Sequence, residues 1–390
     1  MKPIRNIWLM YAVALLQGMV FYGPIAALYR QAAGISIFQI TLIESISLAL
    51  CLLFELPWGI IADRIGYKRT MVFCCMLYFI SKVVFWKADS FGGFLTERIM
   101  LSIVISGLSG VDSSVLYLSC QKNQSQKVFG IYNNLQTAGL LMASAVFSLF
   151  IKDNYRMAGL LTVVSYAAAA ILAFLLVEVK SSEKKEAKAR EFAGLFKNTI
   201  HNRYLLLFLI AVALLNETHQ TATVFLNQLQ YIKCGLSNTA IGYIYILVTL
   251  AGMLGVFSEK LTRKMGLRKI APILYISAAT GCLILGLTSS PWLSALSIII
   301  LRISFSLFQP LQTELQNRQV LSDNRATELS INAVIIDGVG ITTNLVYGRL
   351  AETDIALPMF SGVFLCFIGF LFFQIWQRGT AGSLIHNNGD

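Results

Sequence analysis

The sequence has 390 residues, of which 56% are hydrophobic and 13% are charged, and its mean hydropathy is +0.67. A soluble domain carries about 25% charged residues, so the composition excludes an ordinary soluble protein. The net charge of +11 does not indicate a nucleic-acid-binding protein, because the basic residues lie mostly in short joins between apolar stretches. Each stretch is about 20 residues long, the length that a helix needs to cross a bilayer core of ~30 Å. The sequence therefore predicts an all-α membrane protein with many spans.

Twelve membrane-spanning helices are predicted along the chain. We place them at roughly 7–28, 39–61, 70–88, 93–118, 128–151, 157–178, 203–226, 237–258, 270–288, 293–316, 328–350 and 357–377. Of the 31 Lys and Arg residues, 22 lie in joins on one side, 6 lie in joins on the other side, and the spans contain Lys82, Arg98 and Arg302. Because positive charge accumulates on the cytoplasmic side, we expect both termini in the cytoplasm, Arg30 and Lys233 outside, and insertion in the cytoplasmic (inner or plasma) membrane.

The two halves of the chain repeat each other. Three segments recur at offsets of 201, 200 and 204 residues: 34–40 in 235–241, 64–69 in 264–269, and 98–99 in 302–303. Duplicated six-span halves are a recurring transporter architecture. We therefore predict a six-helix bundle over 1–179, a cytoplasmic linker over 180–202, a second six-helix bundle over 203–378 and a cytoplasmic tail over 379–390. In the linker, Phe192, Leu195, Phe196 and Ile200 share one helical face, which favours a helix on the membrane surface; a solvated linker is the alternative.

The join between the second and third spans carries the most specific motif. Gly59 to Arg69 resembles the signature G-x-L-A-D-R-x-G-R-K-R of the major facilitator superfamily, with departures at Ile61 and Tyr67. The resemblance implies the major facilitator fold, with twelve helices in two pseudo-symmetric halves. It also implies a gating role for Gly59, Asp63, Arg64, Gly66, Lys68 and Arg69. We expect Asp63 to pair with a cation at the cytoplasmic end of span eleven, for which Arg325 is the best candidate in the sequence. The corresponding second-half segment has lost the glycine and the aspartate, which Glu259 and Arg263 replace.

Three further segments resemble a subset of bacterial facilitators, many of which are labelled drug or small-molecule exporters. They are Glu55-Leu56-Pro57, Ser109-Gly110-Val111-Asp112 and the segment from Arg325 to Ser330. The fifth span lacks the Gly-Pro-x-x-Gly-Gly run that marks drug/proton antiporters of this superfamily.

Ionisable residues inside spans are costly and indicate function. In the first half the candidates are Glu44, Glu55, Arg98 and Asp112, and the depths of Glu44 and Arg98 in the outer half are similar. Glu55 has a structural alternative, which is to brace the helix kink at Pro57. The resemblance implies that the third span faces lipid, so we expect Lys82 on this span to extend to the membrane surface. We expect Glu97 to be hydrated at a span end.

In the second half the seventh span is the most polar. The candidates there are Asn216, Glu217, His219 and Gln220, joined by Arg302 in span ten and Asp337 in span eleven. Glu217 and Arg302 have similar predicted depths, and the family resemblance places spans seven and ten at the central cavity. We therefore expect them to interact, either as a proton-coupling site or as a static pair. For His219 the simpler interpretation is a hydrogen-bonded packing residue.

The sequence contains no nucleotide-binding loop, zinc-site spacing or nucleophile elbow, so we expect neither an enzyme nor a cofactor or metal site. The predicted function is secondary active transport of a small organic solute by alternating access, as proton-coupled efflux. An uptake symporter or facilitator is the first alternative, and a non-transporting membrane enzyme or receptor is the second. The cavity candidates are mainly amides, aromatics and acids, which favours an amphiphilic or cationic solute. The expected partners are this solute and the lipid bilayer, with no nucleic acid, and we expect a monomer.

Overall fold

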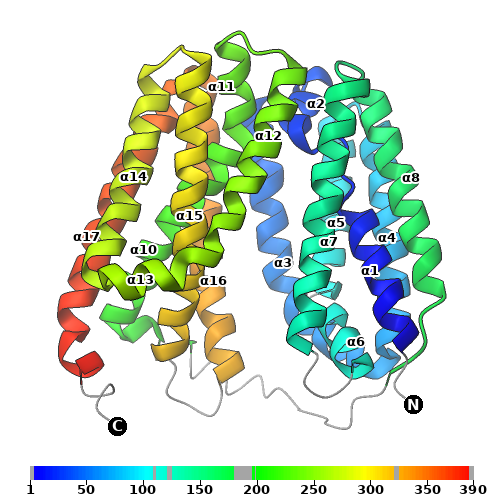
Figure 1. Ribbon diagram of the computed structural model, residues 1–390, viewed down its shortest axis with the longest axis horizontal. Helices are drawn as coiled ribbons and strands as arrows, with labels where there is room; N and C mark the ends of the chain where they lie inside the picture. The colour runs from blue at the N-terminus through cyan, green and yellow to red at the C-terminus, as the bar shows by residue number, and fades with distance from the viewer. Residues whose placement is uncertain are drawn as a thin grey trace. The chain divides into compact units, whose positions relative to one another are not determined.

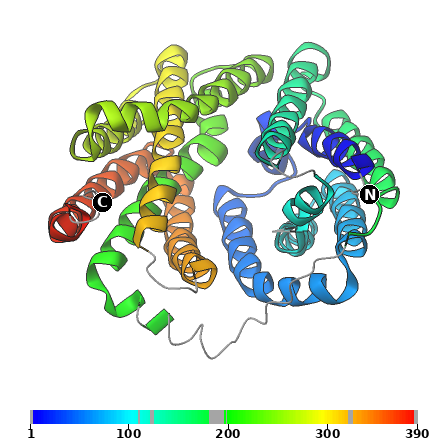
Figure 2. The same ribbon diagram turned by 60° about the horizontal axis from the view of Figure 1, so that its bottom comes forward.

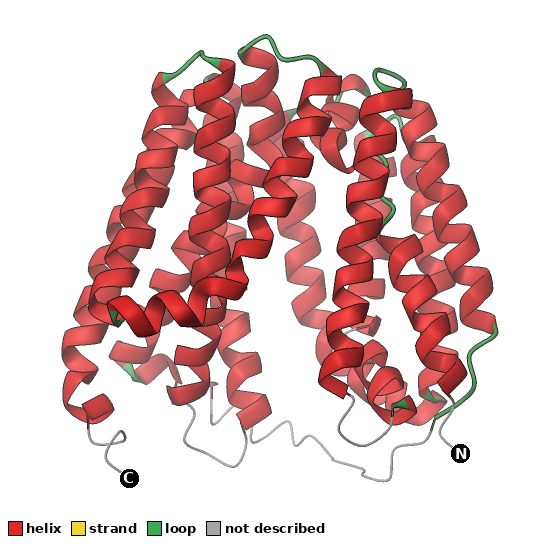
Figure 3. Cartoon of the chain, in the orientation of Figure 1, coloured by secondary structure: helices red, strands yellow, loops and turns green. Residues whose placement is uncertain are grey.

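The computed structural model describes residues 4–108, 111–120, 125–179, 196–197, 199–319 and 325–385, with side chains described except at 55–57, 59–64, 125–127, 325–327 and 381–385. These residues form helices and connecting loops only (Figure 3). Within them, twelve segments are long and apolar enough to cross a membrane, which confirms the predicted number of spans. The predicted linker helix falls largely outside the described residues.

The helices follow one another along the chain as Figure 1 shows. Up to the linker they are α1 (Ile4–Gly18), η1 (Gly23–Ile25), α2 (Ala26–Ala32), α3 (Ile37–Ile65), α4 (Tyr67–Lys87), α5 (Phe91–Leu108), α6 (Val111–Ser119), α7 (Ser125–Val146), the π-helical η2 (Phe147–Ile151) and α8 (Tyr155–Phe174). After it they are α10 (Arg203–Gln220), the π-helical η3 (Thr221–Leu226), α11 (Asn227–Lys233), α12 (Asn238–Gly252), η4 (Met253–Phe257), α13 (Ser258–Met265), α14 (Leu267–Leu287), α15 (Pro291–Gln319), α16 (Arg325–Thr353) and α17 (Ala356–Ile385).

The chain divides into two compact units. One comprises Met1–Lys185 with Ser237–Thr249, and the other comprises Glu186–Leu236 with Leu250–Asp390. Most of α12 therefore belongs with the first unit. In the oblique view of Figure 2, the blue, cyan and blue-green helices of the first unit gather into one bundle. The boundaries expected from the sequence for the two bundles, the linker and the tail stay predictions.

The backbone shows the internal repeat directly. Gly34 and Gly235 have φ values of +83° and +78°, and Gly66 and Gly266 have φ values of +96° and +77°. Glycine adopts this region without the penalty that a Cβ imposes, so each half makes the same two turns at offsets of 201 and 200 residues. The third sequence match, of 98–99 with 302–303, does not pair structurally equivalent positions. The helices that carry it, α5 and α15, begin at Phe91 and Pro291, which are 200 residues apart. By these helix starts, Arg98 corresponds to Ile298, and Arg302 lies about one turn further along its helix.

The first and seventh spans are irregular at corresponding places. The first span breaks after Gly18 and resumes with α2, while the seventh passes through the π-helical turn η3 before α11. Single π-helical turns occur frequently at functional sites. Neither irregularity was predicted from the sequence.

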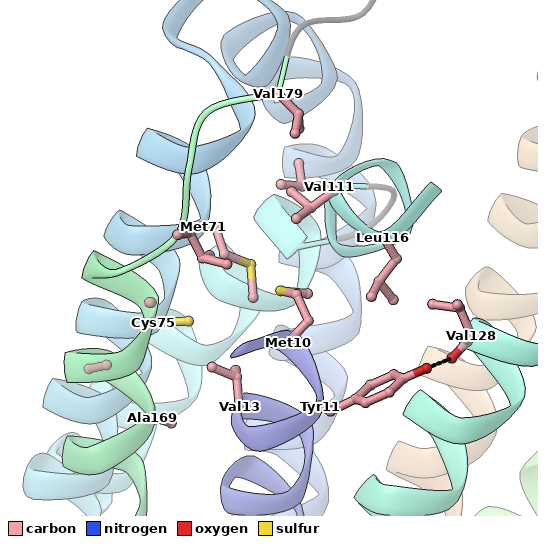
Figure 4. Close-up of a cluster of buried hydrophobic side chains, with 14 of the residues drawn as sticks. Met10, Tyr11, Val13, Met71, Cys75, Val111, Leu116, Val128, Ala169 and Val179 are labelled. Carbon is pink, nitrogen blue, oxygen red and sulfur yellow. Dashed lines mark hydrogen bonds between the residues drawn. The ribbon is translucent and has the colours of Figure 1, made fainter. Parts of the chain in front are cut away.

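Apolar side chains hold the first unit together (Figure 4). Met10 and Val13 of α1 pack against Met71 of α4 in a buried cluster that also includes residues of α6, α7 and α8. At the edge of the cluster the Tyr11 hydroxyl donates a hydrogen bond of 3.4 Å to the carbonyl oxygen of Val128 (Figure 4). Where α1 crosses α7, Gly139 has no room for a Cβ because the backbone of α1 lies against it. Small residues allow such close helix packing inside membranes.

Candidate functional site

The signature join is built around the turn at Gly66. Gly59, Asp63 and Arg64 lie in the last turns of α3, where the structure does not describe their side chains, and the same holds for Arg325 at the start of α16. The proposed Asp63–Arg325 pair therefore stays a prediction.

A residue that the sequence analysis missed braces this join. The backbone N–H of Lys68 donates a hydrogen bond of 3.1 Å to Oε1 of Glu178, which follows the sixth span. The same carboxylate lies against Gly66, where a Cβ would come within 2.9 Å of Oε2. Arg69 is exposed on the first turn of α4. Glu178 therefore holds the turn between α3 and α4 from the end of the sixth span.

The first unit contains a buried chain of five charged side chains, which we call the charge chain. Its members alternate in sign and come from four helices: Arg98 (α5), Glu44 (α3), Arg30 (α2), Glu97 (α5) and Lys82 (α4). Arg98 donates from Nη2 to Oε2 of Glu44, whose Oε1 accepts from Nη1 of Arg30 at 3.1 Å. Nη2 of Arg30 lies 3.9 Å from Oε2 of Glu97, and Nζ of Lys82 donates to Oε1 of Glu97 at 3.1 Å.

The charge chain is enclosed except at one end. The side chains of Arg30, Glu44, Lys82 and Glu97 are at most 6% exposed, whereas that of Arg98 is 23% exposed. Three expectations are therefore corrected. Lys82 points into the bundle instead of toward lipid, Glu97 is buried instead of hydrated, and Arg30, which was expected to be reachable from outside, is buried. In each case an opposite charge on a neighbouring helix compensates the burial, as a charge inside a membrane requires. The similar depth predicted for Glu44 and Arg98 is confirmed by their ion pair.

Aromatic rings enclose the Lys82 end. Nζ of Lys82 lies over the rings of Tyr22, Tyr78 and Tyr166, at 5.8, 5.1 and 5.6 Å from their centroids. Arg30 lies over Phe85 at 5.7 Å. Such ring faces attract cations, the more so where water is excluded. The Lys82 end is therefore a closed cationic site with one carboxylate and three rings around it.

The second half lacks this charge chain. By the offsets of 201 and 200, the positions that correspond to Arg30, Glu44, Lys82, Glu97 and Arg98 are occupied by Tyr231, Tyr245, Cys282, Ser297 and Ile298. None of the five is charged, and all except Tyr245 are buried. A six-helix half of this kind thus folds without buried ion pairs at these positions. The charge chain is a special property of the first half.

The other first-half candidates lie apart from the charge chain or outside the described side chains. Asp112 lies in the first turn of α6, where its Oδ1 accepts from the backbone N–H of Ser113 at 2.6 Å and its Oδ2 accepts from the Tyr132 hydroxyl at 3.5 Å. A carboxylate is favourable at a helix N-terminus. Glu55 lies in α3, where its side chain is not described.

In the second unit Glu217 is buried on α10, and no described cation pairs with it. Its Oε2 has no hydrogen-bond partner among the described residues, and it forms no ion pair with any of them. Asp337 of α16 is the charged residue that interacts electrostatically with Glu217. The Glu217 carboxylate also lies against Gly340 of α16, where a Cβ would come within 2.6 Å of Oε1 of Glu217. The expected Glu217–Arg302 interaction is therefore wrong. Arg302 lies against Gly252, and its charge acts on His219.

The remaining polar residues of the seventh span divide between packing and exposure. His219 stacks on Phe305 with a centroid distance of 3.9 Å, and its Nε2 lies 3.0 Å from the Thr223 hydroxyl. These contacts support the packing interpretation of His219. Gln220 is exposed, and Asn216 is half-buried with its Oδ1 unsatisfied among the described residues.

A groove of about 400 Å³ on the second unit runs between α14 and α17. Its walls are apolar and aromatic: Tyr275, Ile276, Ala279, Leu283, Phe360, Val363, Phe364, Cys366, Phe367 and Phe370. It contains none of the candidate residues and no Asp, Glu, Lys or Arg. We assign it no part in transport.

Comparison with known proteins agrees with this architecture. Residues 7–342 match the sequence profile of the Major Facilitator Superfamily. An uncharacterized MFS-type transporter of Methanocaldococcus jannaschii is 24% identical over 202 residues, and the match covers 50% of this chain and about half, 51%, of that protein.

Two solved structures share the fold over nearly their whole length. The nucleoside transporter NupG, as its D323A mutant, has a TM-score of 0.80 at 14% identity, covering 96% of this chain and 99% of that one. An inward-facing bacterial homolog of the human lysosomal transporter Spinster has a TM-score of 0.75 at 17% identity, covering 97% and 98%. With twelve apolar helices in its described residues and a profile match over most of its length, the chain belongs to the major facilitator superfamily and is a multi-pass membrane transporter.

Proposed function

We propose that this chain exports a small organic solute across the cytoplasmic membrane by alternating access and is driven by a proton gradient. The observation that supports proton coupling is the environment of the Glu217 carboxyl. This carboxyl is buried in a membrane-spanning helix and makes no ion pair with a described residue, and Asp337 is the charged neighbour that acts on it.

A carboxyl in such a place is suited to carry a proton. Without a cation, the ionised form is compensated by no opposite charge, so binding a proton removes the cost of the buried charge. Exposure to water when the site opens would favour release of the proton. The π-helical turn η3 begins four residues after Glu217, and such a turn gives the seventh span a place to change its geometry.

The test uses the full chain in membrane vesicles of both orientations under an imposed pH gradient. The probes are uridine, benzoate and ethidium, which represent a nucleoside, an organic anion and an amphiphilic cation. Accumulation in inside-out vesicles with an acidic lumen supports proton-coupled export. Accumulation in right-side-out vesicles under an inward proton gradient would instead identify an uptake symporter.

Glu217→Gln separates coupling from binding. We expect this variant to exchange a transported probe down its gradient but not to concentrate it. The matched control is Glu314→Gln, because Glu314 is an exposed carboxyl whose ion pair among the described residues is with Arg318 of its own helix. If Glu217→Gln still concentrates the probe in proportion to the pH gradient, Glu217 is not the coupling residue.

A further inference from the structure

We infer that the open end of the charge chain, at Arg98, is a binding site for a carboxylate-sized anion. The charge chain contains three cations and two carboxylates, in the order Arg98, Glu44, Arg30, Glu97, Lys82. Each carboxylate already contacts two cations. The chain therefore begins and ends with a cation and carries one positive charge more than its carboxylates compensate.

The excess charge is accessible at one end only. Lys82 is enclosed by Glu97 and three tyrosine rings, and its side chain is 5% exposed. The Arg98 side chain is 23% exposed. An arginine stays protonated in proteins, so the excess charge at this end cannot be removed by loss of a proton. An anion that reaches Arg98 would continue the alternation of signs.

Arg98 also has donors to offer. The one hydrogen bond that its side chain makes to a described residue runs from Nη2 to Glu44, and its Nε, which is itself buried, has no hydrogen-bond partner among the described residues. A guanidinium presents five N–H groups in a planar fork that matches a carboxylate. The bond to Glu44 fixes the plane of this fork, so the site is organised before an anion arrives.

The second half argues against a purely structural explanation. The position that corresponds to Arg98 is Ile298, which is buried, and the position that corresponds to Glu44 is Tyr245. The same fold is thus built there without a cation at the position of Arg98 and without a carboxylate at the position of Glu44. A buried ion pair is weak evidence for stability in general, so a charge chain retained in one half only is better explained by a ligand.

Two sources can supply the anion, and both have the same chemistry at Arg98. One is a carboxylate on the transported solute, and this version rests on the proposed function. The other is a small inorganic anion such as chloride that binds beside the solute. The first source differs from the cationic solute that the sequence favoured, because the sequence alone does not show that Arg30, Lys82 and Arg98 form one group.

The experiment measures binding without transport. Purified full-length protein in detergent is titrated with benzoate, benzamide and chloride in halide-free HEPES–Tris buffer, and binding is followed by calorimetry. Benzamide has nearly the shape of benzoate but no charge. We expect benzoate or chloride to bind saturably and benzamide to bind at least about tenfold more weakly. This factor is the lower limit expected for hydrogen bonds to a charged group.

Three variants complete the test. Arg98→Gln should weaken anion binding by about 10- to 100-fold, and Arg98→Lys, which keeps the charge beside Glu44, should weaken it less. Arg318→Gln, at an exposed arginine with one intrahelical partner, should leave it unchanged. Saturable benzoate binding that chloride does not reduce identifies the solute carboxylate as the source, and chloride binding with no benzoate binding identifies the inorganic anion.

Some results overturn the site. They are equal affinity for benzoate and benzamide without chloride binding, no saturable anion binding, or an anion affinity unchanged in Arg98→Gln. If Arg98→Gln does not fold, an unchanged affinity in Arg98→Lys rejects the site equally. Because this readout does not require a gradient, loss of the anion site leaves proton-coupled export standing, and failure of export leaves the anion site standing.

Discussion

Neutralising Glu97 should destabilise the first unit strongly, because this carboxylate lies between two buried cations. It is 3.1 Å from Lys82 and 3.9 Å from Arg30. In an effective dielectric of about 20 these contacts are worth about 5 and about 4 kcal/mol. Removing the ionic desolvation cost of Glu97 offsets part of the loss. From the behaviour of broken buried pairs we expect Glu97→Gln to lower the free energy of unfolding by about 3–5 kcal/mol.

A double variant tests whether the loss comes from the uncompensated cations. Lys82→Met combined with Glu97→Gln removes one charge of each sign and keeps the side-chain volumes similar. Replacing a buried pair by uncharged residues is often neutral or stabilising by about 1–4 kcal/mol. We therefore expect the double variant to be more stable than Glu97→Gln alone, as the uncharged Cys282 and Ser297 at the corresponding positions of the second half suggest.

The measurement is reversible unfolding by SDS in mixed micelles, followed by intrinsic fluorescence. The control is Glu314→Gln, whose exposed intrahelical partner predicts a loss of at most about 1 kcal/mol. The reasoning is refuted if Glu97→Gln is no more destabilising than this control. It is also refuted if adding Lys82→Met to Glu97→Gln lowers the free energy of unfolding by as much as Lys82→Met alone lowers that of the wild-type protein.

Three further predictions concern orientation and the signature join. A cysteine placed at Lys233 should react with an impermeant maleimide in intact cells and one at Lys184 only after permeabilisation, once reactive native thiols are replaced; labelling at 184 in intact cells would reverse the proposed topology. Asp63→Asn should reduce transport severely with nearly normal expression, and full transport in that variant would remove the gating role. Gly66→Ala should lower the free energy of unfolding by about 1–3 kcal/mol, because a φ of +96° with a ψ of 150° is nearly restricted to glycine, and further by displacing Glu178; unfolding as in wild type would show that the turn relaxes freely.

The twelve spans and the repeat were predictable because they depend on length, composition and spacing. The glycine turns at 34, 66, 235 and 266 confirm the repeat in the backbone. The direction of Lys82 was not predictable from its own span, because α4 is apolar on all sides and its sequence does not mark a lipid face. A signal was nevertheless present. Lys82 and Glu97 lie at nearly equal distances from the turn at 88–90, so two antiparallel helices place them at the same depth.

The interactions of Glu217 could not be derived from depth alone. Arg302 and Asp337 are both at a suitable depth in the sequence, and choosing between them requires the rotation of each helix about its axis. In the structure Gly340 lets α16 approach Glu217 closely, and this contact favours Asp337 as the neighbour. A glycine three residues after an intramembrane aspartate was the feature that the sequence offered for this choice.

The charge chain has a mechanical consequence for the first unit. It links α2, α3, α4 and α5, and Ser47 of α3 and Ser102 of α5 add a hydroxyl contact of 2.7 Å. Sliding one helix by a single residue, about 1.5 Å, would separate several charged groups at once. This would cost more free energy than the same shift at an interface of apolar side chains. These four helices should therefore move as one rigid body during the transport cycle. Any bending of the first unit should then occur outside the charge chain, for example where the first span breaks after Gly18.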